Sequence, residues 1–167
     1  MRKLSKLSKI KHQFFYIIIL IIYMEIEYFS DNKHKYSTAL MFAYINLYKP
    51  NKNKLNLNDL SFNLEYNSWE NNVRPIDVLN DMKNKKYKDE VSRIKNADIK
   101  YPIIIDSNYN ILDGVHRYVK HIIENKKTID VYIFDKKIMK KFIIGKRDEK
   151  INLKLNDFIE LFNMRFK

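Results

Sequence analysis

The sequence predicts an α+β fold, in which helices flank a small mixed β-sheet. Short runs of β-branched residues, "IIID" at 103–106 and "TIDVYIF" at 128–134, indicate buried or half-buried strands. Stretches with apolar residues at helical spacing alternate with them, as in "VHRYVKHIIEN" at 115–125. The 167 residues are 46% hydrophobic, which is enough for a real core and fits one main domain.

The N-terminal end combines a basic stretch, 1–13, with eleven consecutive apolar residues, 14–24. A membrane-spanning helix needs about 20 apolar residues, and no small-residue cleavage site of a secretory signal follows. Three interpretations stay open: a signal-anchor-like or membrane-surface segment, a buried strand, or an extension upstream of a true start at Met24. We favour the last. We therefore expect 1–23 to be an extension, 24–167 to form a single domain, and the protein to be cytoplasmic rather than anchored through 14–24.

Five further helices are predicted from apolar spacing and end signals. They cover 35–48, a short stretch from about residue 76, 85–98, 135–145 and 155–166. Ser37 or Thr38 can cap the first of these, with Tyr36 on its apolar stripe. Asp135 can cap the fourth and Gly145 can end it. Residues 55–66 instead alternate between apolar and polar side chains, which predicts one short strand or two.

The order of elements is clearest over 101–134: strand, turn, short strand, helix and returning strand. The turn carries Asp106, Asn108 and Asn110, which have the spacing of the start of a calcium loop. That loop needs Gly at its sixth place and Glu at its twelfth, where this chain has Ile111 and Arg117. We therefore interpret the turn as part of a β-hairpin and predict no metal site there.

The stretch "DGVHR", residues 113–117, is called the DGVHR corner below, and its residues suit phosphate binding. A helix that starts after Gly114 offers unpaired N–H groups and partial positive charge, and a glycine lets a ligand approach the backbone. His116 and Arg117 then lie in the first turn, where they can donate to phosphate oxygens. Asp113 fits as a helix cap, as an acceptor for a ligand hydroxyl, or as a metal-linked or acid–base group. The alternative interpretation is a capped helix with a solvated His-Arg pair.

The run 101–134 resembles the ParB/sulfiredoxin-like superfamily, and most of all its members with a D-G-x-H-R motif. These include the free-serine-kinase branch and proteins of large DNA viruses, which would act in the host cytoplasm. The resemblance implies that ATP, ADP or CTP, with Mg²⁺ as a further cofactor, binds through Gly114, His116 and Arg117. It also implies phosphotransfer to a small hydroxyl-bearing acceptor, or NTP hydrolysis, with Asp113 and His116 as catalytic residues. Such a kinase needs a further carboxylate from an earlier strand region, for which Glu65 is our first candidate and Glu70 the second.

Two departures from the superfamily narrow this expectation. Val115 stands where sulfiredoxins carry their catalytic cysteine, and the chain has no cysteine, which argues against sulfinic-acid reduction. The Gly-Glu-Arg-Arg run of partition proteins is absent, and only 33 residues, 135–167, follow Phe134. This is too short for the DNA-binding helical domain of those proteins, so we do not expect a role in chromosome partitioning.

The net charge of +12 leaves a second function open. Of the 32 basic residues 26 are Lys, and Asn, Ile and Tyr are also abundant, as AT-rich codons would produce. Dedicated readers of nucleic acid usually rely on Arg, which this chain uses six times. The alternative to a nucleotide-binding protein is therefore a non-catalytic nucleic-acid-binding module, with the Lys-rich stretches 1–11 and 136–150 as its surface.

Overall fold

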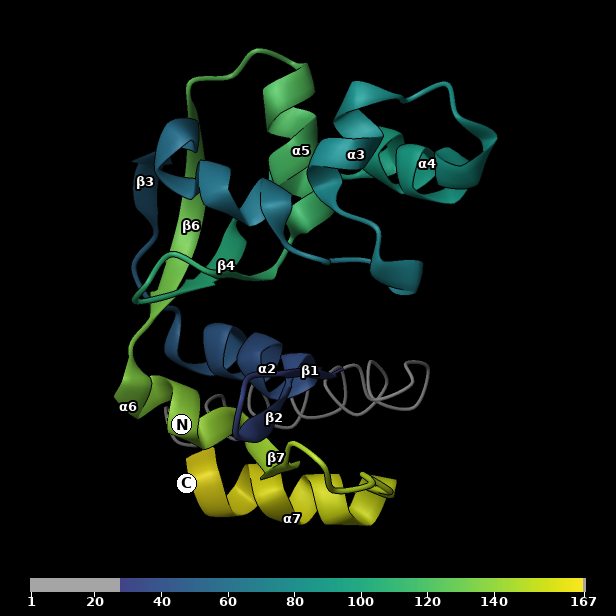
Figure 1. Cartoon of the computed structure of the whole chain (residues 1–167). Coiled ribbons are helices and arrows are strands. Elements are labelled where there is room, and N and C mark those ends of the chain that lie inside the picture. Colours follow the sequence, from purple (N-terminus) through teal and green to yellow (C-terminus); the bar gives the residue numbers. More distant parts are fainter. Residues whose placement is uncertain (1–27, 167) are drawn as a thin grey trace. The chain divides into compact units, whose positions relative to one another are not determined.

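The computed structural model describes residues 28–166 (Figure 1). The predicted extension 1–23, the start at Met24 and the anchor at 14–24 lie outside these residues. Between residues 28 and 166, no helix combines the length and the apolar character that crossing a membrane requires.

The fold is α+β, as predicted, and its strands form two small sheets. The contacts within the chain divide it into two compact units, the first made of residues up to 49 and from 139 onward, the second of Pro50–Ile138. The first unit holds a sheet with the order β1 (Tyr28–Ser30), β2 (His34–Ser37), β7 (Ile143–Lys146). The second holds a sheet with the order β3 (Asn53–Asn56), β6 (Thr128–Phe134), β4 (Ile103–Asp106), β5 (Ile111–Asp113).

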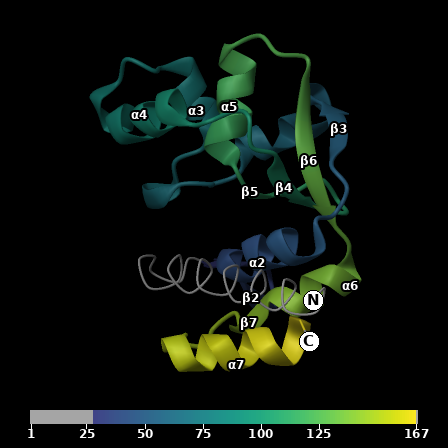
Figure 2. The same ribbon diagram turned by 180° about the vertical axis from the view of Figure 1, so that it is seen from behind.

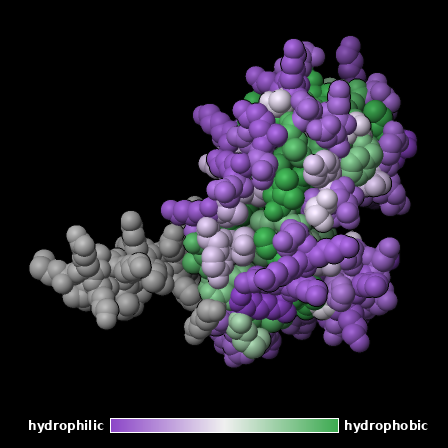
Figure 3. Space-filling view, turned by 90° about the vertical axis from the view of Figure 1, so that its left-hand side faces the viewer, coloured by the Kyte–Doolittle hydropathy of each residue, from purple (hydrophilic) through white to green (hydrophobic). Residues whose placement is uncertain are grey.

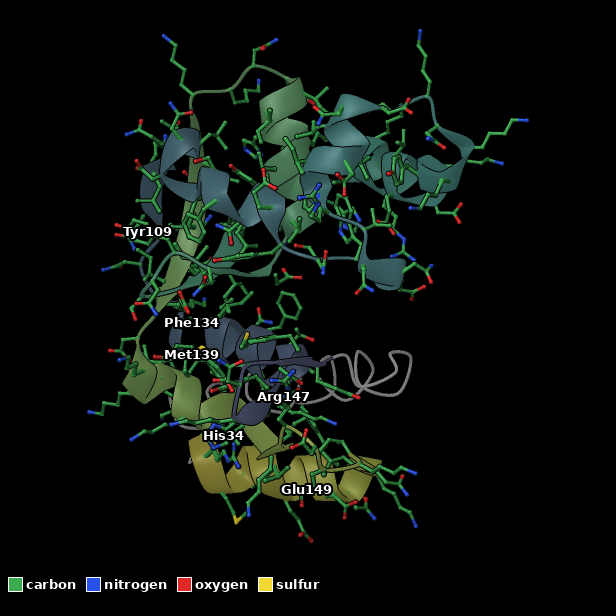
Figure 4. All side chains as sticks on the ribbon, in the orientation of Figure 1. His34, Tyr109, Phe134, Met139, Arg147 and Glu149 are labelled. Carbon is green, nitrogen blue, oxygen red and sulfur yellow. The ribbon has the colours of Figure 1, made fainter. Side chains whose placement is uncertain are left out.

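The first unit combines its antiparallel sheet with helices α2 (Thr38–Tyr48) and α7 (Leu155–Phe166). Ser37 caps α2 as predicted, because its Oγ accepts a hydrogen bond from Leu40 N at 3.3 Å. The ring centroids of Tyr44 and Phe166 lie 6.2 Å apart, which connects α2 to α7. The fully buried side chains of this unit include Leu40, Met41, Phe142 and Phe158. The side chains of His34, Arg147 and Glu149 lie near the β2–β7 pair (Figure 4).

Parts of two predicted helices lie in strands instead. Tyr36 lies in β2 instead of α2, and its hydroxyl donates to Asp31 Oδ2 at 2.7 Å. Asp135 caps α6 (Lys136–Met139) by accepting from Ile138 N at 2.7 Å, but Gly145 lies in β7 and does not end a helix. Both errors have one cause: β2 and β7 pair with each other, and this pairing overrides the helical spacing of the local sequence.

Strand β6 is an inner strand of the second unit's sheet, antiparallel to β3 and parallel to β4. The run Ile103–Ile105 in β4 is completely buried, as its β-branched residues predict. Strands β4 and β5 form the predicted antiparallel hairpin. Asp106 closes it, because its carboxylate accepts hydrogen bonds from Asn108 N at 2.8 Å and Asn110 N at 2.9 Å.

Helix α5 (Val115–Ile123) connects β5 to β6 and packs into two core clusters. Tyr118 belongs to the cluster formed with the sheet, and Val119 to the cluster formed with α3 (Pro75–Asn80) and α4 (Lys88–Asn96). Figures 1 and 2 show α3 and α4 beside α5, and the contacts between these helices agree. Ile123, the last residue of α5, is 39% exposed.

The prediction of strands over 55–66 is wrong after Asn56. A 3₁₀ helix covers Leu57–Glu65. The leucines at 57, 60 and 64 recur at intervals of three and four, so all of them can face the core from a helix. The even interval between 60 and 64 also fits the alternation of a strand, which explains the wrong prediction. Phe62, which lies between them, is 38% exposed.

Candidate functional site

The DGVHR corner lies where β5 leads into α5. Strand β5 ends at Asp113, Gly114 has a left-handed backbone with φ 99° and ψ 24°, and α5 begins at Val115. A residue with a Cβ atom adopts that backbone at a cost, which explains the glycine. A Cβ at position 114 would also lie 2.6 Å from Ile103 Cγ2 and 2.7 Å from Arg117 Nη2. The space that we expected Gly114 to leave for a phosphate is therefore filled by Arg117 and Ile103.

Arg117 folds back from the first turn of α5 and forms an ion pair with Asp113, between Nη2 and Oδ2. The two side chains are 19% and 27% exposed. Within residues 28–166, Arg117 Nε is buried and has no hydrogen-bond partner. A buried donor without an acceptor costs about 1–3 kcal/mol. The ion pair thus leaves one buried donor of the guanidinium group without a partner.

The corner offers an anion unpaired N–H donors and the partial positive charge of a helix N-terminus. The N–H groups of Val115, His116 and Arg117 belong to the first turn of α5, where helical acceptors are missing, and no side chain caps them. This end of a helix carries partial positive charge, and the guanidinium group adds to that charge. Asp113 offsets part of it as the partner of Arg117. The interpretation of Asp113 as a helix cap is wrong, because the cap position belongs to Gly114.

His116 is held from two sides. Its Nε2 lies 2.6 Å from Oε2 of Glu90 in α4, and the Glu90 side chain is 14% exposed. The ring of Trp69, which also packs against the core, stacks on the imidazole with centroids 4.8 Å apart and planes 16° apart. A carboxylate can accept a hydrogen bond but cannot donate one. Glu90 therefore fixes the hydrogen of His116 on Nε2 and leaves Nδ1 for other partners. His121, also in α5, is buried and donates from Nδ1 to Arg117 O at 2.8 Å.

Sequence reasoning did not identify Glu90. It lies 26 positions from His116 and outside the run that resembles a known superfamily. One signal could have found it: Tyr87, Glu90 and Ile94 are spaced by three and four, so a carboxylate lies on the inward stripe of an amphipathic helix. An acid in such a place needs a partner.

Glu65, our first candidate for the catalytic carboxylate, forms an ion pair with Arg74 at 2.9 Å, and its side chain is 61% exposed. Arg74 also holds Asp77 at 2.7 Å, and this hydrogen bond lowers the pKa of Asp77. Within the described residues, no hydrogen bond or ion pair connects Glu65 with the DGVHR corner. Glu70, the second candidate, is exposed in the 3₁₀ helix Glu70–Asn72. The carboxylate that contacts the corner from another helix is Glu90.

Neither a metal-ligand cluster nor a relative identifies the site. Between residues 28 and 166, no group of three or more His, Asp or Glu residues is arranged to hold a metal ion. A Mg²⁺ that arrives with a nucleotide needs only one or two protein carboxylates beside the phosphates, and Asp113 is a carboxylate at the corner. The chain was compared with family models, curated proteins and solved structures, and none of them matches it.

Proposed function

We propose that this chain is a nucleotide-binding protein of the ParB/sulfiredoxin-like kind, which binds the phosphates of ATP, ADP or CTP at the DGVHR corner. One observation carries the proposal: the guanidinium group of Arg117, with its Nε free and buried, lies at the uncapped N-terminus of α5. A cation at that end of a helix is unfavourable by about 0.3–1 kcal/mol. A phosphate group would accept hydrogen bonds from the helix N–H groups and the guanidinium group together.

In this proposal, the phosphate and Asp113 compete for Arg117. The ion pair holds the guanidinium group in place while no ligand is bound. When a phosphate takes the guanidinium group, the Asp113 carboxylate is released and can hold a Mg²⁺ that accompanies the nucleotide. Bound there, Mg²⁺ would neutralise charge on the phosphates.

The corner also supports phosphotransfer or nucleotide hydrolysis as the activity. In either reaction an oxygen nucleophile, from a small hydroxyl-bearing acceptor or from water, attacks phosphorus while the bond to the leaving oxygen breaks. The nucleophile's proton passes to a base. His116 is suited to accept it at Nδ1, because Glu90 holds Nε2. In this proposal His116 is the base, the role for which the sequence suggested Glu65, and Glu90 orients His116. A cytoplasmic location fits this function, because nucleotides are plentiful there.

Isothermal titration calorimetry with ATP, ADP and CTP, each with and without Mg²⁺, tests the proposal. We expect at least one nucleotide to bind and to shift the backbone amide signal of Gly114 in a ¹H–¹⁵N spectrum. The chain has only two glycines, so that signal is easily assigned. The proposal is wrong if none of the three nucleotides binds the folded protein, or if Gly114 does not respond to the one that binds.

A further inference from the structure

A second candidate site lies in the second unit, on a side of α4 that the DGVHR corner does not use. Residues 82–85 and one face of α4 form a pocket with a volume of about 360 Å³. Four of its nine lining residues are Lys: Lys83, Lys85, Lys88 and Lys95. Lys accounts for 26 of the 167 residues of the chain, so composition alone does not explain this concentration.

The positive charge of the pocket is not neutralised by neighbouring acids. None of the lining residues is Asp or Glu, and within residues 28–166 none of the four Lys Nζ atoms forms an ion pair or a hydrogen bond. Three carboxylates adjoin lining residues along the chain, Asp81, Asp89 and Glu90, and within residues 28–166 none of them forms an ion pair with the four Lys. Asp81 accepts from Asn84 Nδ2 at 3.0 Å, and Glu90 holds His116. Charges of one sign that line a concave surface attract ligands of the opposite sign.

The geometry of α4 keeps this pocket apart from the DGVHR corner. Lys88, Ser92 and Lys95 are spaced by four and three, so they lie on one face of the helix. Glu90 lies two positions after Lys88, about 200° around the helix axis, and contacts His116. A ligand in the pocket and a ligand at the corner would therefore contact opposite sides of α4.

We propose that this pocket binds a small ligand that bears several phosphate groups. Lys is a compact cation on a flexible stem, which suits phosphates in varied arrangements, and the side chains of Ser92 and Asn96 add neutral donors. Only Met82 and Val91 are apolar, and no lining residue is aromatic, so recognition falls on the phosphates and not on a nucleobase. A volume of about 360 Å³ is typical of sites for small molecules, which favours a small polyphosphate over a nucleic-acid strand.

An NMR titration of the full chain with inorganic tripolyphosphate tests this proposal. Backbone amides of 83–85 and 88–96 report on the pocket, and Gly114 reports on the corner. We expect saturable shifts at the pocket, and we expect the double variant Lys88→Gln/Lys95→Gln to weaken the affinity there about tenfold. The double variant Lys52→Gln/Lys127→Gln removes the same charge from exposed positions outside the pocket. It should leave the affinity within about twofold.

The proposal is overturned if the pocket amides do not shift when Gly114 does, or if the two double variants weaken binding equally. It is also overturned if a single-stranded oligonucleotide shifts the pocket amides and tripolyphosphate does not, since the surface would then belong to a nucleic acid. Because Gly114 is read in the same spectra, a failure at the pocket is distinguishable from a failure at the corner.

Discussion

Gly114 is constrained by both its backbone and its neighbours. Its φ of 99° is strained for any residue with a Cβ atom, and that atom would press on Ile103, which is fully buried. We expect Gly114→Ala to lower the free energy of unfolding by about 1–3 kcal/mol, measured by urea denaturation.

Gly145 is the matched control. It has no left-handed backbone, and a Cβ there would meet the side-chain ends of Ile151 and Glu149, which can move. Gly145→Ala should therefore cost less stability than Gly114→Ala. Equal losses in the two variants would show that the left-handed corner is not the source of the constraint.

Glu90 contributes to stability through its bond to His116. The contact is 2.6 Å long and largely shielded from solvent, and hydrogen bonds to charged groups contribute about 1.5–3 kcal/mol. We expect Glu90→Ala to lower the free energy of unfolding by an amount in that range. Glu124→Ala removes a carboxylate that is 36% exposed and 3.8 Å from Lys126, so it should cost less than about 0.5 kcal/mol. A similar small cost for both variants would contradict this role of Glu90.

Tyr118 gives the stability a pH dependence. Burial raises the pKa of Tyr118 to about 12, and its hydroxyl donates to Leu57 O at 3.1 Å. In the unfolded chain a Tyr titrates near pH 10, so folding favours the neutral phenol. The stabilisation of the fold that results is complete below about pH 10 and is lost as the pH approaches 12. Between pH 9.5 and 11.5, we expect the unfolding free energy of Tyr118→Phe to fall by about 1.5–2 kcal/mol less than that of the wild type. An equally steep fall in both proteins would contradict the assignment.

Among the elements, the 3₁₀ helix Leu57–Glu65 is hydrogen-bonded to the β4–β5 hairpin through the side chain of Asn63. Asn63 is 3% exposed; its Nδ2 donates to Leu60 O and Tyr109 O, both at 3.0 Å, and its Oδ1 accepts from Ile111 N at 2.9 Å. Tyr109, at the hairpin, is labelled in Figure 4. Because β5 leads directly into the corner, this amide also supports the candidate site.

We expect Asn63→Ala to lower the free energy of unfolding by about 2–4 kcal/mol, since it leaves buried backbone groups without partners. Asn108→Ala, in the exposed hairpin turn, should cost less than about 0.5 kcal/mol, because only the backbone of Asn108 is bound. If the two variants unfold at the same urea concentration, Asn63 is not the tie between these elements.

The elements that the sequence predicts well are those in which local pattern and burial agree. The run Ile103–Ile105 is β-branched and completely buried, and α5 has its apolar residues at helical spacing. The 3₁₀ helix from Leu57 could not be predicted, since its leucines fit two periods. The contacts of Glu90 and Trp69 with His116 could not be predicted either, because packing between distant segments makes them.

At the scale of the whole molecule, the structure shows where part of the net charge of +12 lies. Hydrophilic side chains cover much of the face drawn in Figure 3, as expected when charged residues face water and bind no ligand. The lysines around α4 differ because they converge on a pocket. The superfamily resemblance and the single domain over 24–167 stay predictions, while the described residues gather into two compact units.

The most direct test of phosphate binding at the DGVHR corner compares two variants that break the same ion pair. With the nucleotide that binds most tightly and without Mg²⁺, Arg117→Ala should weaken binding by about 1.5–3 kcal/mol, the range for hydrogen bonds to charged groups. Asp113→Asn should strengthen binding, because it frees Arg117 from its competitor. Arg147→Ala, an exposed arginine of the other unit, should leave the affinity within about twofold. Phosphate binding by Arg117 at the DGVHR corner is contradicted if calorimetry finds the nucleotide affinity of Arg117→Ala unchanged. It is also contradicted if Asp113→Asn loses as much nucleotide affinity as Arg117→Ala.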